Sequence, residues 1–509
     1  MQAALAASHY RRLPHKIATL AALVIAADIL FYGHAVGVSA ALFMLLLVGA
    51  TWHFHRLNLK DPAARLALVL AAAGWLALVE NVSWLSAGFA LAGSIGVTLA
   101  HRVDWVRDGA RWLGRVLWFA ALGWTGAFRD AAAFRQVRKK GRRALISRRR
   151  LIAWILPVGL SLVFVALFAE ANPVISDWLA VIASIDLSYL FAPGRWGFWL
   201  IAAILCWPFI RPRLRRRARK PRTDTAPRSG LTVPAGIGIL FSTDAVLRSL
   251  LVFNALFAVQ TALDAAYLWG GQSLPDGMTY AQYAHRGAYP LMFVALLAAV
   301  FVLIAMRPGS ESARSRLVRG LVYVWVAQTI ILVGASLWRL GLYVSVYSLT
   351  YLRVAALVWM VLVALGLGWI VLRLVWDKSN AWLVRANLLT AMAVLYLCCF
   401  VDFGGAIARF NVEHSRAVTG RGGALDTAYL ERIGPPAIPA LMWYLKNVDA
   451  DGGQMWEAKT LLYELSSKLI VRHGGWRGYS FRSYRLASEV EKIQHELRID
   501  PAPPGRWVY

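Results

Sequence analysis

Apolar stretches long enough to cross a bilayer recur along this chain as far as residue 401, and no other feature constrains its fold as strongly. A helix needs about 20 predominantly apolar residues to cross the hydrocarbon core. Because backbone polar groups find no water there, each crossing segment is expected to be helical. With flanking residues completing the shorter runs, we predict about eleven transmembrane helices: Ile17–Phe31, Val38–Trp52, Leu66–Val79, Val82–Ala100, Leu151–Phe168, Trp196–Phe209, Ala245–Leu268, Ala288–Met306, Leu317–Leu337, Val354–Leu372 and Leu383–Val401.

The composition excludes the soluble classes of protein. Of the 509 residues, 59% are hydrophobic and only 16% are charged, whereas a soluble globular domain carries about 25% charged residues. A chain this apolar is not disordered, and its 3 cysteines do not make a disulfide framework. The sequence therefore predicts an all-α integral membrane protein.

The basic residues are distributed unevenly between the loops. The chain has 55 Lys and Arg residues against 27 Asp and Glu residues, a formal net charge of +28. With a cytoplasmic N-terminus, 36 of the basic residues fall in cytoplasmic segments and 4 in external loops. The positive-inside rule accounts for this asymmetry, so we expect no nucleic acid as a partner. An odd number of spans then places the C-terminal tail outside the cytoplasm.

The basic segment 101–150 allows two interpretations. Tryptophans such as Trp112 and Trp118 lie among Arg107, Arg111 and Arg115. We expect an amphipathic interfacial helix on the cytoplasmic face, with arginines against anionic headgroups and tryptophans at the interface. If residues 112–128 crossed the membrane instead, the C-terminal tail would lie on the other side.

The tail is polar again and has a helical pattern of apolar residues. Leu461, Leu465 and Leu469 line one helix face, and Leu486 begins a similar series that ends at Leu497. We expect three or four packed helices. The chain then divides into a four-span region 1–100, a basic segment 101–150, a seven-span core 151–401 with a basic loop 211–240, and an external helical tail 402–509.

Small residues mark one face of the fourth predicted span. Gly88, Ala92 and Gly96 are spaced four apart. Small residues at this spacing allow membrane helices to approach closely. We therefore expect this face to contact a neighbouring helix.

Polar side chains follow the seventh predicted span. Each is costly inside a bilayer and is a functional candidate for that reason. One interpretation is that they hydrogen-bond between helices, and the sharper one is a path for ions or protons. Asp244 and Arg248 are four apart and can pair on one face. The candidate path consists of Asp244, Arg248, Asn254, Gln260 and Asp264.

A second set of polar residues is expected at the outer ends of spans seven to ten. Arginine with tyrosine and histidine can bind a carboxylate or phosphate through charge-assisted hydrogen bonds. The alternative is an interfacial aromatic belt whose arginines bond loop carbonyls. The candidate anion or headgroup cluster consists of His285, Arg286, Arg339, Tyr343, Tyr347 and Arg353.

Motifs of known chemistry are missing from the sequence. It has no GxxxxGK[ST] loop, no HExxH or CxxC metal motif and no GxSxG nucleophile elbow. We therefore predict no catalytic residue, no metal site and no cofactor.

Several phrases of the sequence resemble an uncharacterised family. They are Tyr280–Leu291, Arg339–Tyr343 with Tyr347–Arg353, and Leu425–Leu430. They are similar to the signature of domain-of-unknown-function family four-one-seven-three, most clearly over residues 150–445. The resemblance implies a bacterial polytopic membrane protein and supplies no activity.

These observations lead to an expected function without an assigned chemistry. We expect a non-enzymatic envelope scaffold, sensor or regulatory subunit in the bacterial inner membrane, with a cytoplasmic N-terminus. Its expected partners are the bilayer, including anionic lipids, and a membrane or envelope protein. A transporter of a small anion or lipid-linked molecule is the alternative. A membrane glycosyl- or phospho-transferase with an atypical site ranks third.

Overall fold

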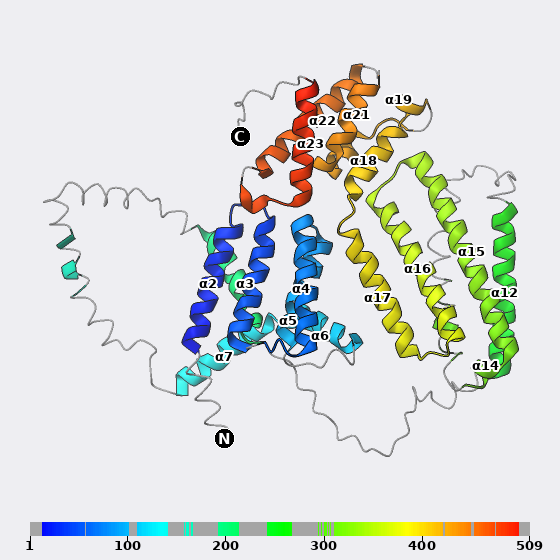
Figure 1. Ribbon diagram of the computed structural model, residues 1–509, viewed down its shortest axis with the longest axis horizontal. Coiled ribbons are helices and arrows are strands. Elements are labelled where there is room, and N and C mark those ends of the chain that lie inside the picture. The colour runs from blue at the N-terminus through cyan, green and yellow to red at the C-terminus, as the bar shows by residue number, and fades with distance from the viewer. Residues whose placement is uncertain are drawn as a thin grey trace, which may run out of the picture. The chain divides into compact units, whose positions relative to one another are not determined.

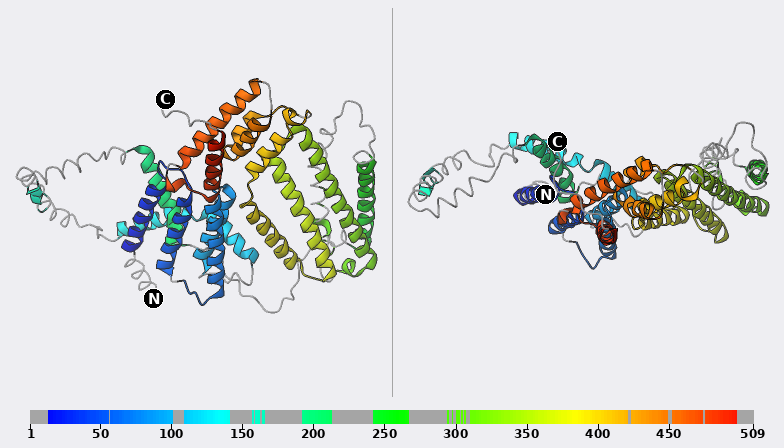
Figure 2. Two further views of the ribbon diagram at one scale, coloured as in Figure 1. Left: turned by 45° about the horizontal axis from the view of Figure 1, so that its top comes forward. Right: turned by 90° about the horizontal axis from the view of Figure 1, so that it is seen from above.

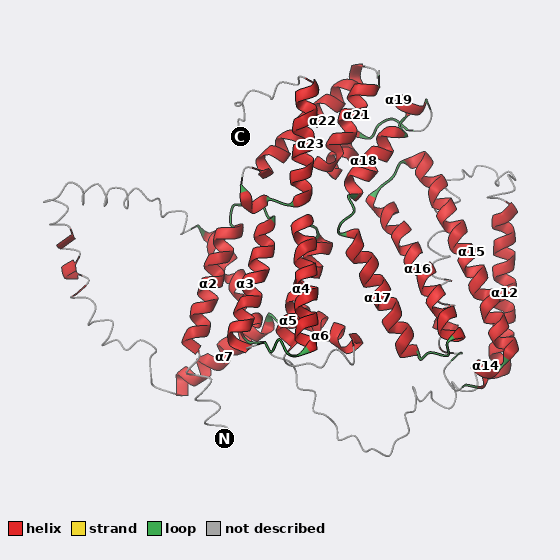
Figure 3. Cartoon of the chain, in the orientation of Figure 1, coloured by secondary structure: helices red, strands yellow, loops and turns green. Residues whose placement is uncertain are grey.

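The computed structural model describes a helical protein (Figures 1 and 3). It describes residues 13–55, 57–100, 109–140, 192–212, 242–266, 310–420, 423–448, 452–473 and 475–497, with isolated positions between 157 and 165 and between 294 and 306. All regular elements within these ranges are helices. Eight of the described helices are long and apolar enough to cross a membrane. The prediction of an all-α membrane protein is therefore confirmed, whereas the count of eleven spans stays a prediction.

The chain divides into two compact units, and the first contains residues 1–217 and 475–479. Its helices are α2 (Leu13–Phe31), α3 (Val38–His55), α4 (Pro62–Glu80), α5 (Trp84–Ala100), α6 (Gly109–Leu122), α7 (Thr125–Lys140) and α10 (Pro193–Ile210). The short η4 (Trp476–Gly478) also belongs here, and the carbonyl of Tyr479 accepts a 2.7 Å hydrogen bond from the Val38 amide. Helices α2, α3, α4 and α10 are candidate spans. Helix α5 is apolar but has only 17 residues.

Helices α4 and α5 pack with their backbones in close approach. A Cβ atom on Gly74 would lie 2.7 Å from the Phe89 carbonyl oxygen, and one on Gly93 would lie 2.6 Å from Ala71 Cα. The predicted contact stripe is wrong at Gly88, where a Cβ atom would meet nothing within 4 Å. The face of α5 that contacts α4 instead includes Ala90 and Gly93, which are buried. These residues lie on a neighbouring face of the helix from Gly88.

The basic segment forms two helices rather than the single amphipathic helix that we predicted. A turn after Leu122 separates α6 from α7, and the Gly123 amide bonds the Phe119 carbonyl at 2.8 Å. In α7, the buried Asp130 accepts a 2.9 Å hydrogen bond from Trp207 Nε1 of α10. An ion pair of 3.0 Å joins Asp130 to Arg211. Helix α7 is thus fixed to the end of α10, and its contact with lipid stays a prediction.

The described membrane helices of the second unit are α12 (Thr243–Asp264), α15 (Arg316–Tyr347), α16 (Tyr351–Val375) and α17 (Asn380–Cys398), with the short α14 (Glu311–Arg314) before α15. Helices α15, α16 and α17 lie side by side in Figures 1 and 2, and α12 packs on α15. Their shared core includes Val322, Trp325 and Met360. Helix α15 extends ten residues beyond the predicted end at Leu337.

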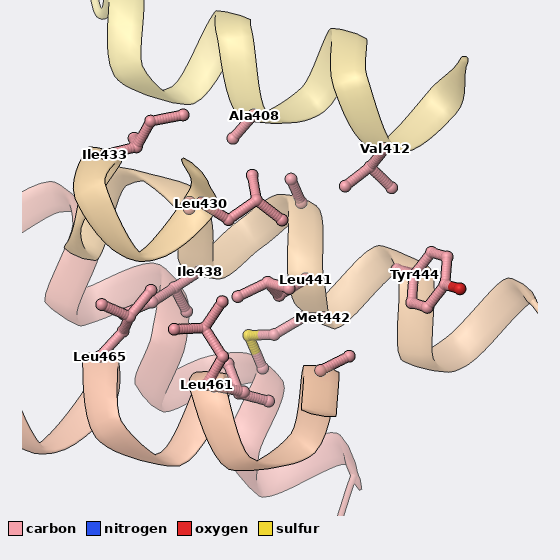
Figure 4. Close-up of a cluster of buried hydrophobic side chains, with 14 of the residues drawn as sticks. Ala408, Val412, Leu430, Ile433, Ile438, Leu441, Met442, Tyr444, Leu461 and Leu465 are labelled. Atoms are coloured by element: carbon pink, nitrogen blue, oxygen red, sulfur yellow. The ribbon is translucent and has the colours of Figure 1, made fainter. Parts of the chain in front are cut away.

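A helical domain follows α17 in the same unit. It consists of α18 (Phe403–Glu413), α19 (Arg416–Thr419), α20 (Thr427–Ile433), η3 (Pro435–Ala437), α21 (Ile438–Asn447), α22 (Gly452–His473) and α23 (Phe481–Leu497). Figure 4 shows its core, in which Leu461 and Leu465 of α22 face Ile438 and Leu441 of α21. The leucine spacing that predicted this helix face is therefore found in the packing. Leu441 and Leu465 are fully buried.

Two predicted spans, Leu151–Phe168 and Ala288–Met306, lie for the most part outside the described residues. The other nine each coincide with a described helix. The side of the membrane on which each terminus lies stays a prediction.

Candidate functional site

A buried ion pair in the membrane part of the second unit joins Asp264 at the end of α12 to Arg339 of α15. Arg339 Nη2 donates to Asp264 Oδ1 in a direct ion pair. The side chains are 1% and 3% exposed. Gln260, one turn earlier on α12, donates a 2.9 Å hydrogen bond to the same carboxylate oxygen. The structure thus brings together one residue from each of the two predicted sites.

The packing of α12 explains why these residues meet. Val246, Leu250, Asn254, Phe257 and Asp264 form its buried stripe, whereas the opposite face, including Leu256 and Val259, is exposed. A stripe at this spacing lines one face of a helix. Because α12 packs on α15, a carboxylate at the end of this stripe faces that helix.

A second polar contact lies two to three turns along the same interface. Asn254 Nδ2 donates to the carbonyls of Leu250, at 2.8 Å, and Leu321, at 3.2 Å. Gln328 Nε2 donates to the Asn254 carbonyl at 3.3 Å. In the described part of the chain, the buried oxygens Asn254 Oδ1, Gln328 Oε1 and Asp264 Oδ2 have no hydrogen-bond donor. The interface between α12 and α15 therefore contains acceptor oxygens without donors next to side chains that are hydrogen-bonded.

The other end of the predicted path differs from expectation. Asp244 and Arg248 are both exposed, and the structure, which describes both residues, records no ion pair between them. An exposed pair gains about 0–1 kcal/mol, which is little compensation for ordering two side chains. The two residues therefore lie apart from the buried Asn254, Gln260 and Asp264.

The described part of the predicted anion cluster is engaged in contacts within the protein. Arg353 Nη1 donates to the carbonyls of Tyr347 and Ser348 at the end of α15. Its guanidinium lies 4.5 Å from the centre of the Tyr343 ring, and the rings of Tyr343 and Tyr347 are 4.8 Å apart. Arg339 is turned toward Asp264. His285 and Arg286 lie outside the described residues.

The turn between α15 and α16 is also held by the helical domain. The buried Asn411 of α18 accepts a 2.6 Å hydrogen bond from the Leu349 amide and donates one of 2.9 Å to the Leu349 carbonyl. The Tyr351 amide donates to the Tyr429 hydroxyl at 2.9 Å. Phrases around Tyr351 and Tyr429 carried the family resemblance, so two of its motifs meet at this turn.

A cavity of about 610 Å³ lies beside the ion pair. Its described lining residues are apolar apart from Gln260 and include Phe253 and Phe257 of α12 and Leu332 of α15. Gln260 therefore borders both the cavity and the Asp264 carboxylate. This arrangement admits an apolar group and offers it one polar contact.

Besides Asp264, the described chain buries the acidic side chains of Asp28, Glu80 and Asp130, and none of them was predicted as a site. Asp28 of α2 accepts hydrogen bonds from Arg195 of α10 and, at 2.9 Å, from Trp199 Nε1. Asp130 pairs with Arg211 as described above. The sequence signal for the Asp28 site is a lone acidic residue inside an apolar run. Its partner Arg195 gives no such signal, because the sequence predicts it in a loop.

The helical domain has a groove of about 690 Å³. It is lined by α18, α21, α23 and the end of α17, with Trp443 40% exposed. The hydrogen bond that Arg409 donates to the Glu413 carboxylate, together with the charge of that carboxylate, raises the pKa of Arg409. Arg482 donates 3.0 Å hydrogen bonds to the carbonyls of Cys399 and Val401 and so fixes α23 to the end of α17. The charged residues that line the groove are Asp402, Arg409, Glu413, Lys446, Arg482, Arg485 and Glu489.

Histidine, cysteine and acidic side chains occur in most of the described ranges. Among those residues, no three His, Cys, Asp or Glu side chains gather in a way that could hold a metal ion. Cys206, Cys398 and Cys399 are free thiols. The contacts described above instead hold helices together.

Comparison with protein families identifies the chain. The model of a family described as a domain of unknown function, DUF4153, matches residues 65–442. The chain belongs to this family. The match confirms the resemblance to a family of unknown function, and the matching family bears the number 4153 rather than 4173. It spans α4 to the first half of α21 and so includes Asp264, Arg339 and Asn411. No curated protein and no solved structure matches the chain.

Proposed function

We propose that this DUF4153 protein is a non-enzymatic scaffold or regulatory subunit of the bacterial inner membrane. The observation that carries the proposal is the buried ion pair between Asp264 and Arg339. Inside a membrane, ionisable residues are retained for a role, and here each charge is neutralised by the other. Such a pair fixes two helices against each other and leaves no net charge for a solute.

The proposed scaffold presents the helical domain to a protein partner. Asn411 and Tyr429 attach this domain to the α15–α16 turn. The groove beside Trp443 carries both charge signs and an exposed aromatic ring. Aromatic residues and arginine are enriched at protein interfaces, which supports a protein as the occupant.

The proposed orientation places the basic loops in the cytoplasm and the helical domain on the opposite side. The asymmetry of Lys and Arg between loops supports this orientation. In the second unit, α14 and the α16–α17 turn lie at the end of the helices away from the helical domain (Figure 1). Anionic lipids at the cytoplasmic surface would contact the basic loops.

Site-specific photo-crosslinking in native membranes tests the scaffold function. A photoreactive residue at Trp443 should form an adduct with one discrete protein. The matched control is Trp456 of α22, which is 68% exposed on the same domain and does not line the groove. Absence of an adduct at Trp443, or the same adducts from both positions, would argue against a partner in the groove.

Transport is the second candidate because the apolar cavity reaches Gln260 next to Asp264. Proteoliposomes containing the wild type or Asp264→Asn distinguish the two functions. The scaffold proposal expects no flux of phosphate or chloride above that of empty liposomes from either protein. Flux in the wild type that Asp264→Asn abolishes would establish a transporter instead.

A further inference from the structure

A small basic pocket lies at the other end of the second unit's membrane helices, away from the helical domain. It has a volume of about 220 Å³ and is formed by α14, the start of α15 and the end of α16. Among the described residues, four cationic side chains and one anionic side chain line it. These are Arg314, Arg319, Arg373 and Lys378, with Asp377 as the anion.

Arg373 is the buried member of this set and is only 3% exposed. Its Nη2 donates to the Met306 carbonyl at 2.7 Å and its Nε donates to the Lys378 carbonyl at 3.3 Å. Its Nη1 is buried, and in the described structure it has no hydrogen-bond partner. A buried donor without an acceptor costs about 1–3 kcal/mol. The pocket is therefore bordered by a guanidinium that is held in place by two carbonyls and keeps one donor without a partner.

The backbone around the pocket holds the other cations in place. Asp377 adopts a left-handed conformation with φ of 49° after the last turn of α16. The Lys378 amide then bonds the Arg373 carbonyl at 3.0 Å, which is the pattern of a Schellman helix end. Across the pocket, Arg319 Nε donates to the Ala313 carbonyl at 2.7 Å. The side chains of Arg373 and Arg319 and the backbone of Lys378 are thus positioned before any ligand binds.

We propose that this pocket binds a phosphate group, supplied either by an anionic lipid headgroup or by free phosphate. Guanidinium and ammonium groups form strong charge-assisted hydrogen bonds with phosphate oxygens. The volume lies below the roughly 300–1,000 Å³ of pockets for drug-sized ligands, so the pocket suits a single phosphate rather than a nucleotide. The unpartnered Nη1 of Arg373 supplies the buried donor, and Arg314 and Lys378 supply exposed charge at the entrance.

Two variants of exposed residues test the proposal without disturbing the fold. Arg314→Gln/Lys378→Gln removes two entrance charges, and Asp377→Asn removes the anion while asparagine still tolerates the left-handed conformation. The control Lys60→Gln removes an exposed charge from the α3–α4 turn, far along the chain from the pocket. Each full-length protein is titrated in neutral detergent with inorganic phosphate by calorimetry. Each is titrated with phosphatidylglycerol or phosphatidylcholine by native mass spectrometry.

The proposal expects the wild type to bind phosphatidylglycerol, inorganic phosphate or both, in preference to phosphatidylcholine. The double variant should lose about 10- to 30-fold in affinity, as expected for two cations near an anionic group. Asp377→Asn should gain affinity, and Lys60→Gln should match the wild type. Binding of phosphatidylglycerol alone identifies the lipid headgroup as the source, and binding of inorganic phosphate identifies free phosphate. No binding by the wild type, or equal losses in the double variant and Lys60→Gln, would overturn the proposal.

Discussion

Asp28 and Asp264 lie on buried faces of apolar helices, and each accepts hydrogen bonds from an arginine on another helix of its own unit. Each also accepts a second hydrogen bond. Asp28 accepts it from Trp199, one turn after Arg195, and Asp264 accepts it from Gln260, one turn earlier on the same helix. A carboxylate in an apolar environment is retained only when it is paired and hydrogen-bonded. At each site, therefore, a buried carboxylate paired with an arginine and hydrogen-bonded to a second side chain joins two helices.

Removing the carboxylate of Asp28 should destabilise the first unit strongly. Asp28→Asn leaves the Arg195 charge buried without its counter-ion, so we expect a loss of about 3 kcal/mol in the free energy of unfolding. Trp199→Phe removes one hydrogen bond and should cost only about 1 kcal/mol. Unfolding in mixed detergent micelles measures both losses. Equal effects of the two variants would show that the ion pair has no special role.

The pairing of these residues could not be predicted from the sequence, although their helices could. Asp264 and Arg339 are 75 positions apart and Asp28 and Arg195 are 167 apart, so no local pattern links them. The lengths of the apolar stretches predict α12 and α15, because the thickness of the bilayer fixes the length of a helix that crosses it. Arg339 was assigned to an external cluster because α15 was expected to end at Leu337, whereas the helix continues to Tyr347.

At the scale of elements, α4 and α5 show how closely two membrane helices can approach. Gly74 and Gly93 lie where a side chain would meet the backbone of the opposite helix. The sequence contained several small residues on α5, and spacing alone did not distinguish the contact face from the face of Gly88. Only the position of α4 decides which glycine is needed.

Gly93→Ala should separate α4 from α5 and lower the thermal unfolding temperature. The added methyl would lie 2.6 Å from Ala71 Cα, and overpacking of this kind costs about 1–3 kcal/mol. Gly88→Ala on the same helix meets open space and should be neutral or slightly stabilising, since alanine favours helix. A thermal shift assay in detergent compares the two. A Gly88→Ala protein that is less stable than Gly93→Ala would show that the contact face is assigned incorrectly.

The attachment of the helical domain to the α15–α16 turn depends on one amide side chain. Asn411→Ala removes both hydrogen bonds to the half-buried backbone of Leu349, at a cost of about 0.5–1.5 kcal/mol for each. We expect faster hydrogen exchange at the turn and in α18, measured by mass spectrometry. Arg409→Ala breaks only an exposed ion pair with Glu413 and should leave exchange at the turn unchanged. Unchanged exchange in Asn411→Ala would refute this attachment.

At the scale of the whole molecule, the sequence and the structure agree on a membrane protein with a helical domain after the last described span. The leucine spacing of α22 is enough to predict a packed helix there, because one apolar face must be buried. The side of the membrane on which the helical domain lies depends on whether the number of spans before it is odd or even. Two predicted spans lie mostly outside the described residues, so charge asymmetry carries the assignment.

Cysteine labelling tests the side on which the helical domain lies. In a variant without native cysteines, a cysteine at Trp456 should react with a membrane-impermeant maleimide added to spheroplasts. A cysteine at Lys60, in a loop assigned to the cytoplasm, should react only after permeabilisation. If both cysteines reacted only after permeabilisation, the helical domain would lie in the cytoplasm and the parity of the spans would change.

The central claim is that the Asp264–Arg339 pair holds α12 to α15, and a double-mutant cycle tests it most directly. The free energy of unfolding is measured in detergent for the wild type, Asp264→Asn, Arg339→Gln and the double variant. We predict a loss of about 3–5 kcal/mol for each single variant, because each leaves one buried charge unpaired. The double variant should lose much less than the sum of the two. Strictly additive losses, or single variants as stable as the wild type, would contradict the claim.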